Sequence, residues 1–401
     1  MNKKPILLIV SLLGGLSLSS CESINPVETV KIDVWAPKEE QKVIETVVNN
    51  WNSTHKEEYQ FKLSFDVEDI EKSTLIYSNS YNLRELISNK QISSIEEKFI
   101  KDKFIDISID SVNYNELYYG YPISFDSSYY LYYNNQYLDN KEVESLEKIL
   151  RIAKDNNKQV LFDISNAYYA ASFLLSPQAC GLDSIRYEIN SEGKAKYDIN
   201  WDNETAVKVS TYISSLLTPY YIDGTLMMMP SFNIDSNIRY EKIIALVSSS
   251  TYDDKYMELL GDNLSADKLP TYNIDKKEYQ LGSFSSTSVY CINSNASNEE
   301  IKTANALAQL LTNKESQLIR YQENKELPTN KKIHNDKGFL KELTAGERAN
   351  ILQSEYSCVQ AKSIEDKFWE VVNPIGKAYI NSDLNGLTWS DFLKNQIELL
   401  R

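Results

Sequence analysis

The sequence predicts a mixed α/β protein with two lobes. Its 401 residues exceed the length at which a single hydrophobic core stops growing, so two packed bodies are expected. Strand-like and helix-like apolar patterns alternate along the whole chain, which is typical of an α/β fold. Hydrophobic residues make up 42% and charged residues 25% of the chain, a globular composition that excludes wholesale disorder.

The N-terminal region is predicted to begin with a strand, a helix and two further strands. Residues 30–35 alternate apolar and polar side chains, as in a half-buried strand. Apolar residues then recur every four positions from Val43 to Trp51, which indicates a helix. Strands are expected at 61–65 and 75–77. This order implies parallel strands joined by a right-handed crossover.

A tyrosine-rich region follows at residues 117–133, where two extended segments are expected with a break at Tyr121-Pro122. Pro122 has no backbone N–H, so its strand should lie at an edge or a crossover. Alternating tyrosines suit strands by β-propensity alone, so we expect a mainly structural role for the following residues: Tyr129, Tyr130, Tyr132 and Tyr133.

Capping motifs predict helices in the C-terminal part. The residues at 297–300 form a Ser-x-x-Glu box, those at 312–315 a Thr-x-x-Glu box, and those at 388–391 a Thr-x-x-Asp motif. Each should open a helix that buries one apolar face. The chain has no linker of low complexity, so the two lobes should be joined by several chain crossings, which is a hinge geometry.

Composition limits the possible partners and chemistry. The net charge is −15 and no Lys/Arg cluster occurs, so nucleic acid is not an expected partner. The two histidines and four cysteines are too scattered for a metal cage, and no cofactor is expected. The 28 tyrosines favour recognition by flat amphipathic rings. Residues 381–386 mimic half of a calcium loop, but Phe392 replaces the bidentate Glu, so a helix-to-helix turn is expected there.

The N-terminus has the pattern of an export signal. Residues 1–20 combine two lysines with a short apolar run and are predicted to be a signal peptide. The run ends in Leu-Ser-Ser-Cys21, which resembles the bacterial lipobox, so Cys21 is the expected lipidation site and 21–29 the tether. The protein should then sit on the extracellular or periplasmic face of the cell membrane. The alternative is a plain secretory signal with an incidental cysteine. The other three cysteines are expected to be small buried hydrophobic residues.

Six segments, in order, resemble the extracellular solute-binding lipoproteins of bacterial carbohydrate ABC transporters, of the maltose/maltodextrin-binding type. These segments are Val30–Trp35, Tyr119–Asp126, Leu161–Tyr168, Gly261–Phe284, the helix pair at 297–322, and Phe368-Trp369. The resemblance implies a type II periplasmic-binding-protein-like fold, whose discontinuous lobes close on a hinge. It places one lobe at 30–124 plus 286–336 and the other at 125–285 plus 337–401.

The same resemblance implies a monomeric, non-catalytic protein that captures a maltodextrin-like oligosaccharide and delivers it to a membrane permease. Aromatic rings cover the C–H faces of sugars, while carboxylates and amides bind the hydroxyl groups. Asp126 matches a hydroxyl-binding carboxylate, with a solvated acid at a turn as the alternative. Tyr168, Tyr252 and Trp369 match stacking aromatics, and core packing is the alternative for Tyr168 and Trp369. Trp35 is expected to support the cleft floor from the core.

Several positions depart from the family pattern. Ser78 and Tyr81 stand where the family usually offers an aromatic and an acidic residue. Asn166, which we expect to bind ligand, replaces a carboxylate by a neutral amide and so offers a weaker acceptor. Arg239 and Lys242 replace a Phe and a Gly. These changes bear on the identity of the sugar more than on the fold.

Two other classes of function stay open at this point. A secreted glycosidase would need two carboxylates flanking a sugar, and the sequence offers no convincing partner for Asp126, because Asn166 is an amide. A divergent carbohydrate-binding or adhesin-like surface lipoprotein would keep the fold without transport binding.

Overall fold

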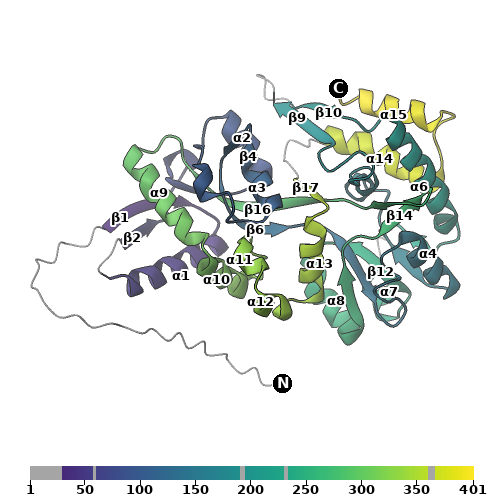
Figure 1. The fold of residues 1–401 in the computed structure, drawn as a ribbon, viewed down its shortest axis with the longest axis horizontal. Coiled ribbons are helices and arrows are strands. Elements are labelled where there is room, and N and C mark those ends of the chain that lie inside the picture. The colour runs from purple at the N-terminus through teal and green to yellow at the C-terminus, as the bar shows by residue number, and fades with distance from the viewer. Residues whose placement is uncertain (1–28, 57–59, 190–194, 230–233, 360–365) are drawn as a thin grey trace, which may run out of the picture.

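The computed structural model describes residues 29–401 except 57–59, 190–194, 230–233 and 360–365. Two α/β lobes lie side by side, and strands β6 and β16 run between them (Figure 1). The N-terminal segments and the returning helices α9 and α10 build one lobe, while the teal and yellow segments build the other. The two-lobed fold class is therefore confirmed.

The sheet of the first lobe has the order β17-β16-β3-β1-β2, and β6 pairs with β16 beside it. Its strands are β1 (Thr29–Trp35), β2 (Gln60–Ser64), β3 (Leu75–Asn79), β6 (Tyr121–Asp126), β16 (Ser283–Ile292) and β17 (Ser357–Val359). Strand β1 is parallel to both β2 and β3, which confirms the predicted parallel unit. Helix α1 (Lys38–Thr54) follows β1 and buries Val43 and Val47, as the four-residue spacing predicts.

The predicted break at Tyr121-Pro122 is wrong, because β6 runs through both residues. The strand instead begins after Gly120 and ends before the connection of residues 127–129. Pro122 is tolerated because β6 lies at the edge of the sheet, where β16 is its strand partner. The edge position is therefore confirmed although the boundary differs.

The sheet of the second lobe has the order β11-β8-β12-β7-β13. Its strands are β11 (Leu226–Met227), β8 (Gln159–Leu161), β12 (Ile243–Ser248), β7 (Tyr130–Asn134) and β13 (Leu264–Asp267). Strand β8 is parallel to β11 and β12, whereas β7 is antiparallel to β12 and β13. The tyrosines of residues 129–133 are all buried, which confirms their structural role. Separate two-stranded sheets are β4 (Asn113–Tyr114) with β5 (Leu117–Tyr118), β9 (Ile185–Ile189) with β10 (Ala195–Ile199), and β14 (Thr271–Ile274) with β15 (Lys277–Gln280).

Helices surround both sheets (Figure 1). Those not yet named are α2 (Leu83–Ser88), α3 (Asp106–Val112), α4 (Leu146–Asp155), α5 (Ala167–Ala170), α6 (Glu204–Ile222), α7 (Ile234–Arg239), α8 (Asp253–Leu260), α9 (Asn298–Leu311), α10 (Lys314–Asn324), α11 (Lys331–His334), α12 (Lys337–Glu342), α13 (Ala345–Ser354), α14 (Asp366–Asn381) and α15 (Trp389–Glu398). The box at 297–300 opens α9, and Thr388 caps α15, as predicted. The cap of α10 differs: Asn313 accepts the Ser316 N–H, while Thr312 donates its hydroxyl to the Ala308 carbonyl.

The two largest clusters of buried apolar residues follow the lobes. One combines residues between 32 and 123 with residues between 289 and 311. The other combines residues between 129 and 284 with residues between 358 and 400. Each core is thus built from segments distant in sequence. Cys291 and Cys358 are buried as expected, whereas Cys180 is only half-buried.

The predicted signal peptide, Cys21 and most of the tether lie outside the described residues. Of the described helices, none carries an apolar stretch that would span a lipid bilayer. Residues 382–388 connect α14 to α15, which confirms the helix-to-helix turn. In this turn the Asn381 side chain accepts the Asp383 N–H at 2.9 Å.

Candidate functional site

The strand directions of the two sheets bring their carboxyl ends together. Strands β1, β3 and β6 run the same way, because β16 is antiparallel to both β3 and β6. The second sheet presents the carboxyl ends of β8, β11 and β12 at one edge, where the antiparallel β7 begins. Residues 127–129 join the end of β6 directly to the start of β7. The two edges therefore face each other, and a crevice at the carboxyl ends of such strands is the usual ligand site of open α/β sheets.

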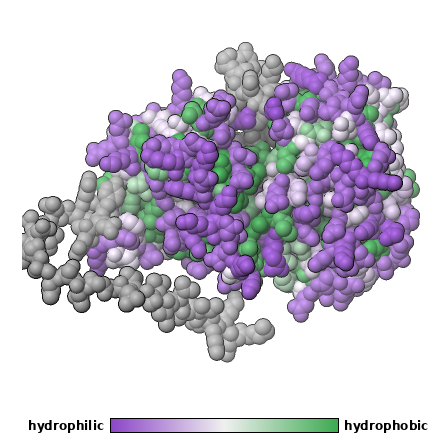
Figure 2. Space-filling view, viewed as in Figure 1, coloured by the Kyte–Doolittle hydropathy of each residue, from purple (hydrophilic) through white to green (hydrophobic). Residues whose placement is uncertain are grey.

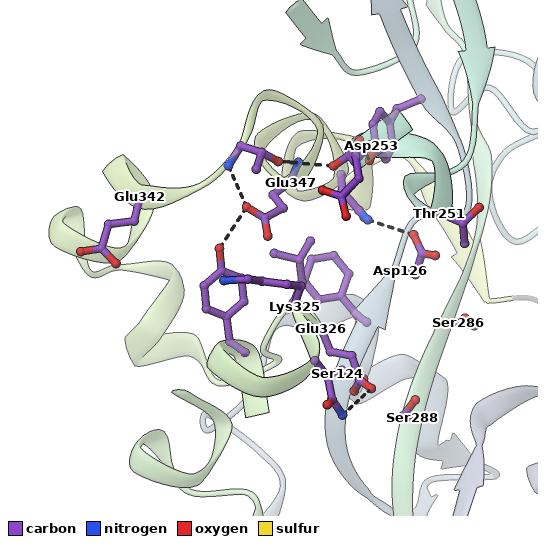
Figure 3. A pocket seen from close by; sticks show the side chains of 18 residues that line it. Ser124, Asp126, Thr251, Asp253, Ser286, Ser288, Lys325, Glu326, Glu342 and Glu347 are labelled. Atoms are coloured by element: carbon purple, nitrogen blue, oxygen red, sulfur yellow. Dashed lines mark hydrogen bonds between the residues drawn. The ribbon is translucent and has the colours of Figure 1, made fainter. Parts of the chain in front are cut away.

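A cavity of about 640 Å³ opens beside this junction. Ser286 and Ser288 of β16 and Asp126 of β6 line it on one side together with Thr251, and Glu342 lies on the opposite side (Figure 3). Around these, six carboxylates line it: Asp126, Asp253, Asp254, Glu326, Glu342 and Glu347, with Lys325 as the cationic residue of the lining. Figure 2 shows apolar residues gathered between the two largely hydrophilic lobes. The lining therefore suits neutral ligands that donate hydroxyl hydrogens and disfavours anionic ones.

Asp126 is the last residue of β6, and its carboxylate is held in place at the cavity. Its Oδ1 accepts the Ser128 N–H at 3.0 Å and the Asn350 amide at 2.9 Å. Asn350 also accepts the Ser127 N–H at 2.8 Å (Figure 3 shows its contact with Asp126). Helix α13 thus fixes the strand end from which the carboxylate faces the cavity.

Tyr168 and Trp369 meet in one aromatic cluster. The Tyr168 ring stacks on Phe284 with centroids 5.4 Å apart and planes at 16°. Trp369 meets Tyr168 edge-on at 5.8 Å and Phe284 at 5.6 Å. Burial raises the pKa of Tyr168 well above its usual value, so its hydroxyl stays a neutral donor. Both Tyr168 and Trp369 are half-buried and pack against the core of the second lobe, as the core alternative expects, and neither is among the residues that line the cavity.

Helix α14 positions this cluster by packing on the turn between β8 and α5. Asn373, one turn after Trp369, accepts the Ala167 N–H at 2.7 Å. At Gly376 an added Cβ would lie 2.2 Å from the Ile164 carbonyl oxygen, so the close approach requires glycine. Asn166 is exposed and caps α5, because its side-chain oxygen accepts the Tyr168 N–H at 2.9 Å. Because the side-chain oxygen of Asn166 is used in this cap, the group that could bind a ligand is its amide nitrogen, which donates hydrogen bonds.

Tyr252 lies at the same edge of the second sheet, in the 3₁₀ turn Ser250–Tyr252 that follows β12. Its side chain is 46% exposed. The ring packs against Tyr256 at 5.9 Å, and the Lys255 ammonium lies 5.9 Å from its centroid. The structure thus brings Tyr168 and Trp369 into contact, while Tyr252 packs on α8 and is not among the residues that line the cavity.

The sequence profile described as "Bacterial extracellular solute-binding protein" matches residues 45–345. The chain belongs to this family. The galactooligosaccharide-binding protein of Bacillus subtilis (strain 168) is 28% identical over 273 residues, which cover 65% of this chain and 60% of that relative. The match thus spans less than two thirds of the relative's length.

Solved structures share the fold of this solute-binding protein. A maltodextrin-binding protein of L. casei BL23 without ligand has a TM-score of 0.73 at 16% identity, covering 93% of this chain and 99% of that one. A Staphylococcus aureus solute-binding protein in complex with maltose has a TM-score of 0.70 at 14% identity, covering 92% and 96%. At these identities the similarity establishes the two-lobed fold.

The expected core position of Trp35 is wrong. Ile32 and Val34 take the inward positions of β1, and the alternation places Trp35 on the other side, where it is 39% exposed. Tyr81 follows β3 and is also 39% exposed. Of the other departures from the family pattern, Lys242 directly precedes β12 and so lies at its end remote from the facing edges.

Arg239 ends α7 and is exposed. It therefore belongs to the same remote side of the second lobe as the start of β12. Ser78 lies within β3 opposite Val289. Of the five departures, Tyr81 and Asn166 lie next to the facing edges.

Sequence reasoning missed the carboxylates that accompany Asp126 in the cavity. Asp253 accepts hydroxyl hydrogens from Tyr132, Tyr130 at 3.4 Å and Thr344 at 3.3 Å. It sits against the N-terminus of α13, where a Cβ at Gly346 would lie 2.0 Å from its oxygen. Burial raises the pKa of Asp253. These contacts make it a carboxylate that fixes α13.

Glu347 also has fixed partners, since it accepts the Tyr321 hydroxyl at 3.0 Å and completes a capping box with Thr344. The Thr-x-x-Glu spacing at 344–347 was a readable signal for this helix start. Asn350 carried no such signal, because its contacts with residues 126 and 127 are remote in sequence.

Proposed function

We propose that this solute-binding protein captures a neutral oligosaccharide between its lobes and delivers it to the membrane permease of an ABC importer. The observation that carries the proposal is the cavity beside the facing edges of the two sheets, which Asp126 lines, with the Tyr168–Trp369 cluster following the carboxyl end of β8 in the second lobe. Membership of the family and the names of its relatives, which bind maltodextrins and a galactooligosaccharide, support the same class of ligand.

The proposed binding follows from the surface chemistry of sugars. A pyranose ring has apolar C–H faces, which the exposed parts of Tyr168 and Trp369 would cover, with Tyr252 adding a further ring. The Asp126 carboxylate would accept hydroxyl hydrogens, and Asn166 would donate through its amide. Charge-assisted hydrogen bonds of this kind strengthen when lobe closure removes water.

Lobe closure would also signal the bound state to the permease. The proposed lobes are 30–124 plus 286–336 and 125–285 plus 337–401. The chain passes between them three times, which suits a hinge. A ligand that contacts both lobes stabilises the closed arrangement by its differential affinity. We further propose that the protein acts as a monomer without catalysis. A lipid on Cys21 would hold it at the extracellular or periplasmic face of the cell membrane.

A thermal-shift screen against a panel of neutral oligosaccharides, including maltodextrins and galactooligosaccharides, tests this function. Binding to the native state alone should stabilise it by about 2.7 kcal/mol at a hundredfold excess over Kd. The absence of any shift across the panel would contradict the proposal. Because further carboxylates line the cavity with Asp126, the same mixtures should be checked for hydrolysis. Products that disappear in Asp126→Asn would identify a glycosidase instead.

A further inference from the structure

Two exposed aromatic side chains lie at the carboxyl edge of the first lobe's sheet, for which the sequence assigned no ligand contact. Trp35 is the last residue of β1, and Tyr81 lies in the 3₁₀ turn Ser80–Asn82 after β3. Both are 39% exposed, whereas Ile32 and Val34 on the same strand as Trp35 are buried. Trp35 shares the outer side of β1 with the exposed Lys31, and both aromatic residues lie at the carboxyl ends of strands, on the edge that also carries Asp126.

Hydrogen bonds attach the Tyr81 turn to the floor of the cavity. The Ser80 hydroxyl accepts the Thr287 N–H at 3.0 Å, and Thr287 lies between the cavity-lining Ser286 and Ser288. Asn79, which pairs with Ser288, accepts the Tyr81 N–H at 3.2 Å. The backbone of Tyr81 is therefore fixed at the end of the strand next to the cavity.

The backbone of Trp35 is placed equally firmly. It pairs with Ile76 in the parallel register of β1 with β3. The following residue, Ala36, receives a hydrogen bond from the Gln41 amide at 2.8 Å, which fixes the turn into α1. Trp35 thus ends β1 beside Ile76, and Tyr81 follows the end of the neighbouring parallel strand β3, at the same edge of the sheet.

We propose that Trp35 and Tyr81 form the apolar wall of the first lobe and cover a face of the bound sugar. This inference rests on the proposed function and names the residues with which the first lobe grips the ligand. Ser286, Ser288 and Asp126 line the cavity beside this edge and would bind hydroxyl groups, whereas Trp35 and Tyr81 lie outside that lining and would cover a C–H face. Closure of the two lobes then places the sugar between Trp35 and Tyr81 on one side and the Tyr168–Trp369 cluster on the other.

The position of these rings also accounts for a change from the family pattern. Ser78, where the family usually has its aromatic residue, lies within β3 opposite Val289. Tyr81 and Trp35 supply rings beyond the strand ends instead. The ligand would therefore be contacted further out on the first lobe, so the set of sugars bound should differ from that of relatives with an aromatic residue at this position.

Calorimetric titration with the panel saccharide that gives the largest thermal shift tests this proposal. Trp35→Ala and Tyr81→Ala should each weaken binding about tenfold, as expected for one lost ring contact. Trp35→Phe and Tyr81→Phe should retain most of the affinity. Tyr240→Ala is the matched control, because Tyr240 is 72% exposed but lies between α7 and β12, at the remote end of that strand.

The melting temperature of each variant without ligand shows whether the variant folds. If an alanine variant does not fold, the corresponding Phe variant still tests the ring contact. Ligand-induced changes in tryptophan emission should shrink in Trp35→Phe. If both alanine variants fold and bind as tightly as the wild type, Trp35 and Tyr81 do not contact the sugar. This inference then fails, while the proposed function stands. If the wild type binds no saccharide of the panel, the proposed function fails with it.

Discussion

Gly376 of α14 lies so close to Ile164 that a Cβ on the glycine would sit 2.2 Å from the Ile164 carbonyl oxygen. This contact seats α14 on the turn that leads into α5, the helix of Tyr168, while Trp369 of α14 touches the Tyr168 ring. The geometry of the aromatic cluster therefore depends on a residue that cannot itself contact a ligand.

Gly376→Ala should consequently disturb both stability and binding. Overpacking of this kind lowers the free energy of unfolding by about 1–3 kcal/mol, and the displaced helix should separate Trp369 from Tyr168. Chemical denaturation and saccharide titration measure the two effects. Gly338→Ala in α12 is the control, since the nearest atom there is the flexible Asp336 carboxylate at 3.2 Å. Equal stability of both variants would show that α14 tolerates a shift.

Asp126→Asn should weaken saccharide binding by about tenfold to a hundredfold, because a charged acceptor of hydroxyl hydrogens is replaced by a neutral one. Titration calorimetry provides the affinity. Glu342→Gln removes a charge from the same cavity lining, but at α12, and should leave the affinity unchanged. A similar loss in both variants would point to the overall charge of the cavity rather than to Asp126.

Asp253 should make stability depend on pH. Its carboxyl pKa is raised by burial, so the folded state binds this proton more tightly than the unfolded chain, where the pKa is about 3.9. The resulting penalty is absent below the unfolded pKa and complete above the folded one. The melting temperature of the wild type, relative to Asp253→Asn, should therefore fall as pH rises from about 4 towards 7. A constant difference across this range would show that the carboxyl pKa is not raised.

A buried ion pair should contribute to stability without affecting binding. Arg320 is 1% exposed, and both of its terminal nitrogens lie 2.5 Å from Glu40 oxygens, which joins α10 to α1. Glu40→Gln should lower the free energy of unfolding by about 3 kcal/mol, because it leaves the buried guanidinium with the half-buried Glu326 carboxylate, 3.5 Å away, as its counter-charge. The double variant Glu40→Leu/Arg320→Met should recover much of this loss in a double-mutant cycle. A single variant as stable as the wild type would show that the pair is not buried in solution.

Local sequence patterns predicted most helices and strands correctly, and the errors have physical causes. The alternation in β1 placed Ile32 and Val34 inward, and the same period assigns Trp35 to the outer side. The expected core position of Trp35 disagrees with that register. A helix directly after α9 was predicted correctly, but its predicted cap, Thr312, was wrong by one residue, because two neighbouring polar residues competed for the cap. Thr312 turned back to the Ala308 carbonyl, which left the cap to Asn313.

The contacts that hold the site residues in place could not be predicted from local sequence patterns. Asp126 and its partner Asn350 are separated by 224 positions, and no spacing rule brings them together. The same holds for Ala167 and Asn373, which are 206 positions apart. Such contacts arise only when helices from the second half of the chain pack on strand ends from the first half.

A crystal structure of the protein with the saccharide that raises its melting temperature most would test the central claim most directly. We predict a sugar ring in contact with the rings of Tyr168 and Trp369, with a hydroxyl group hydrogen-bonded to Asp126. A saccharide bound elsewhere on the molecule, with these three side chains free of it, would contradict the account.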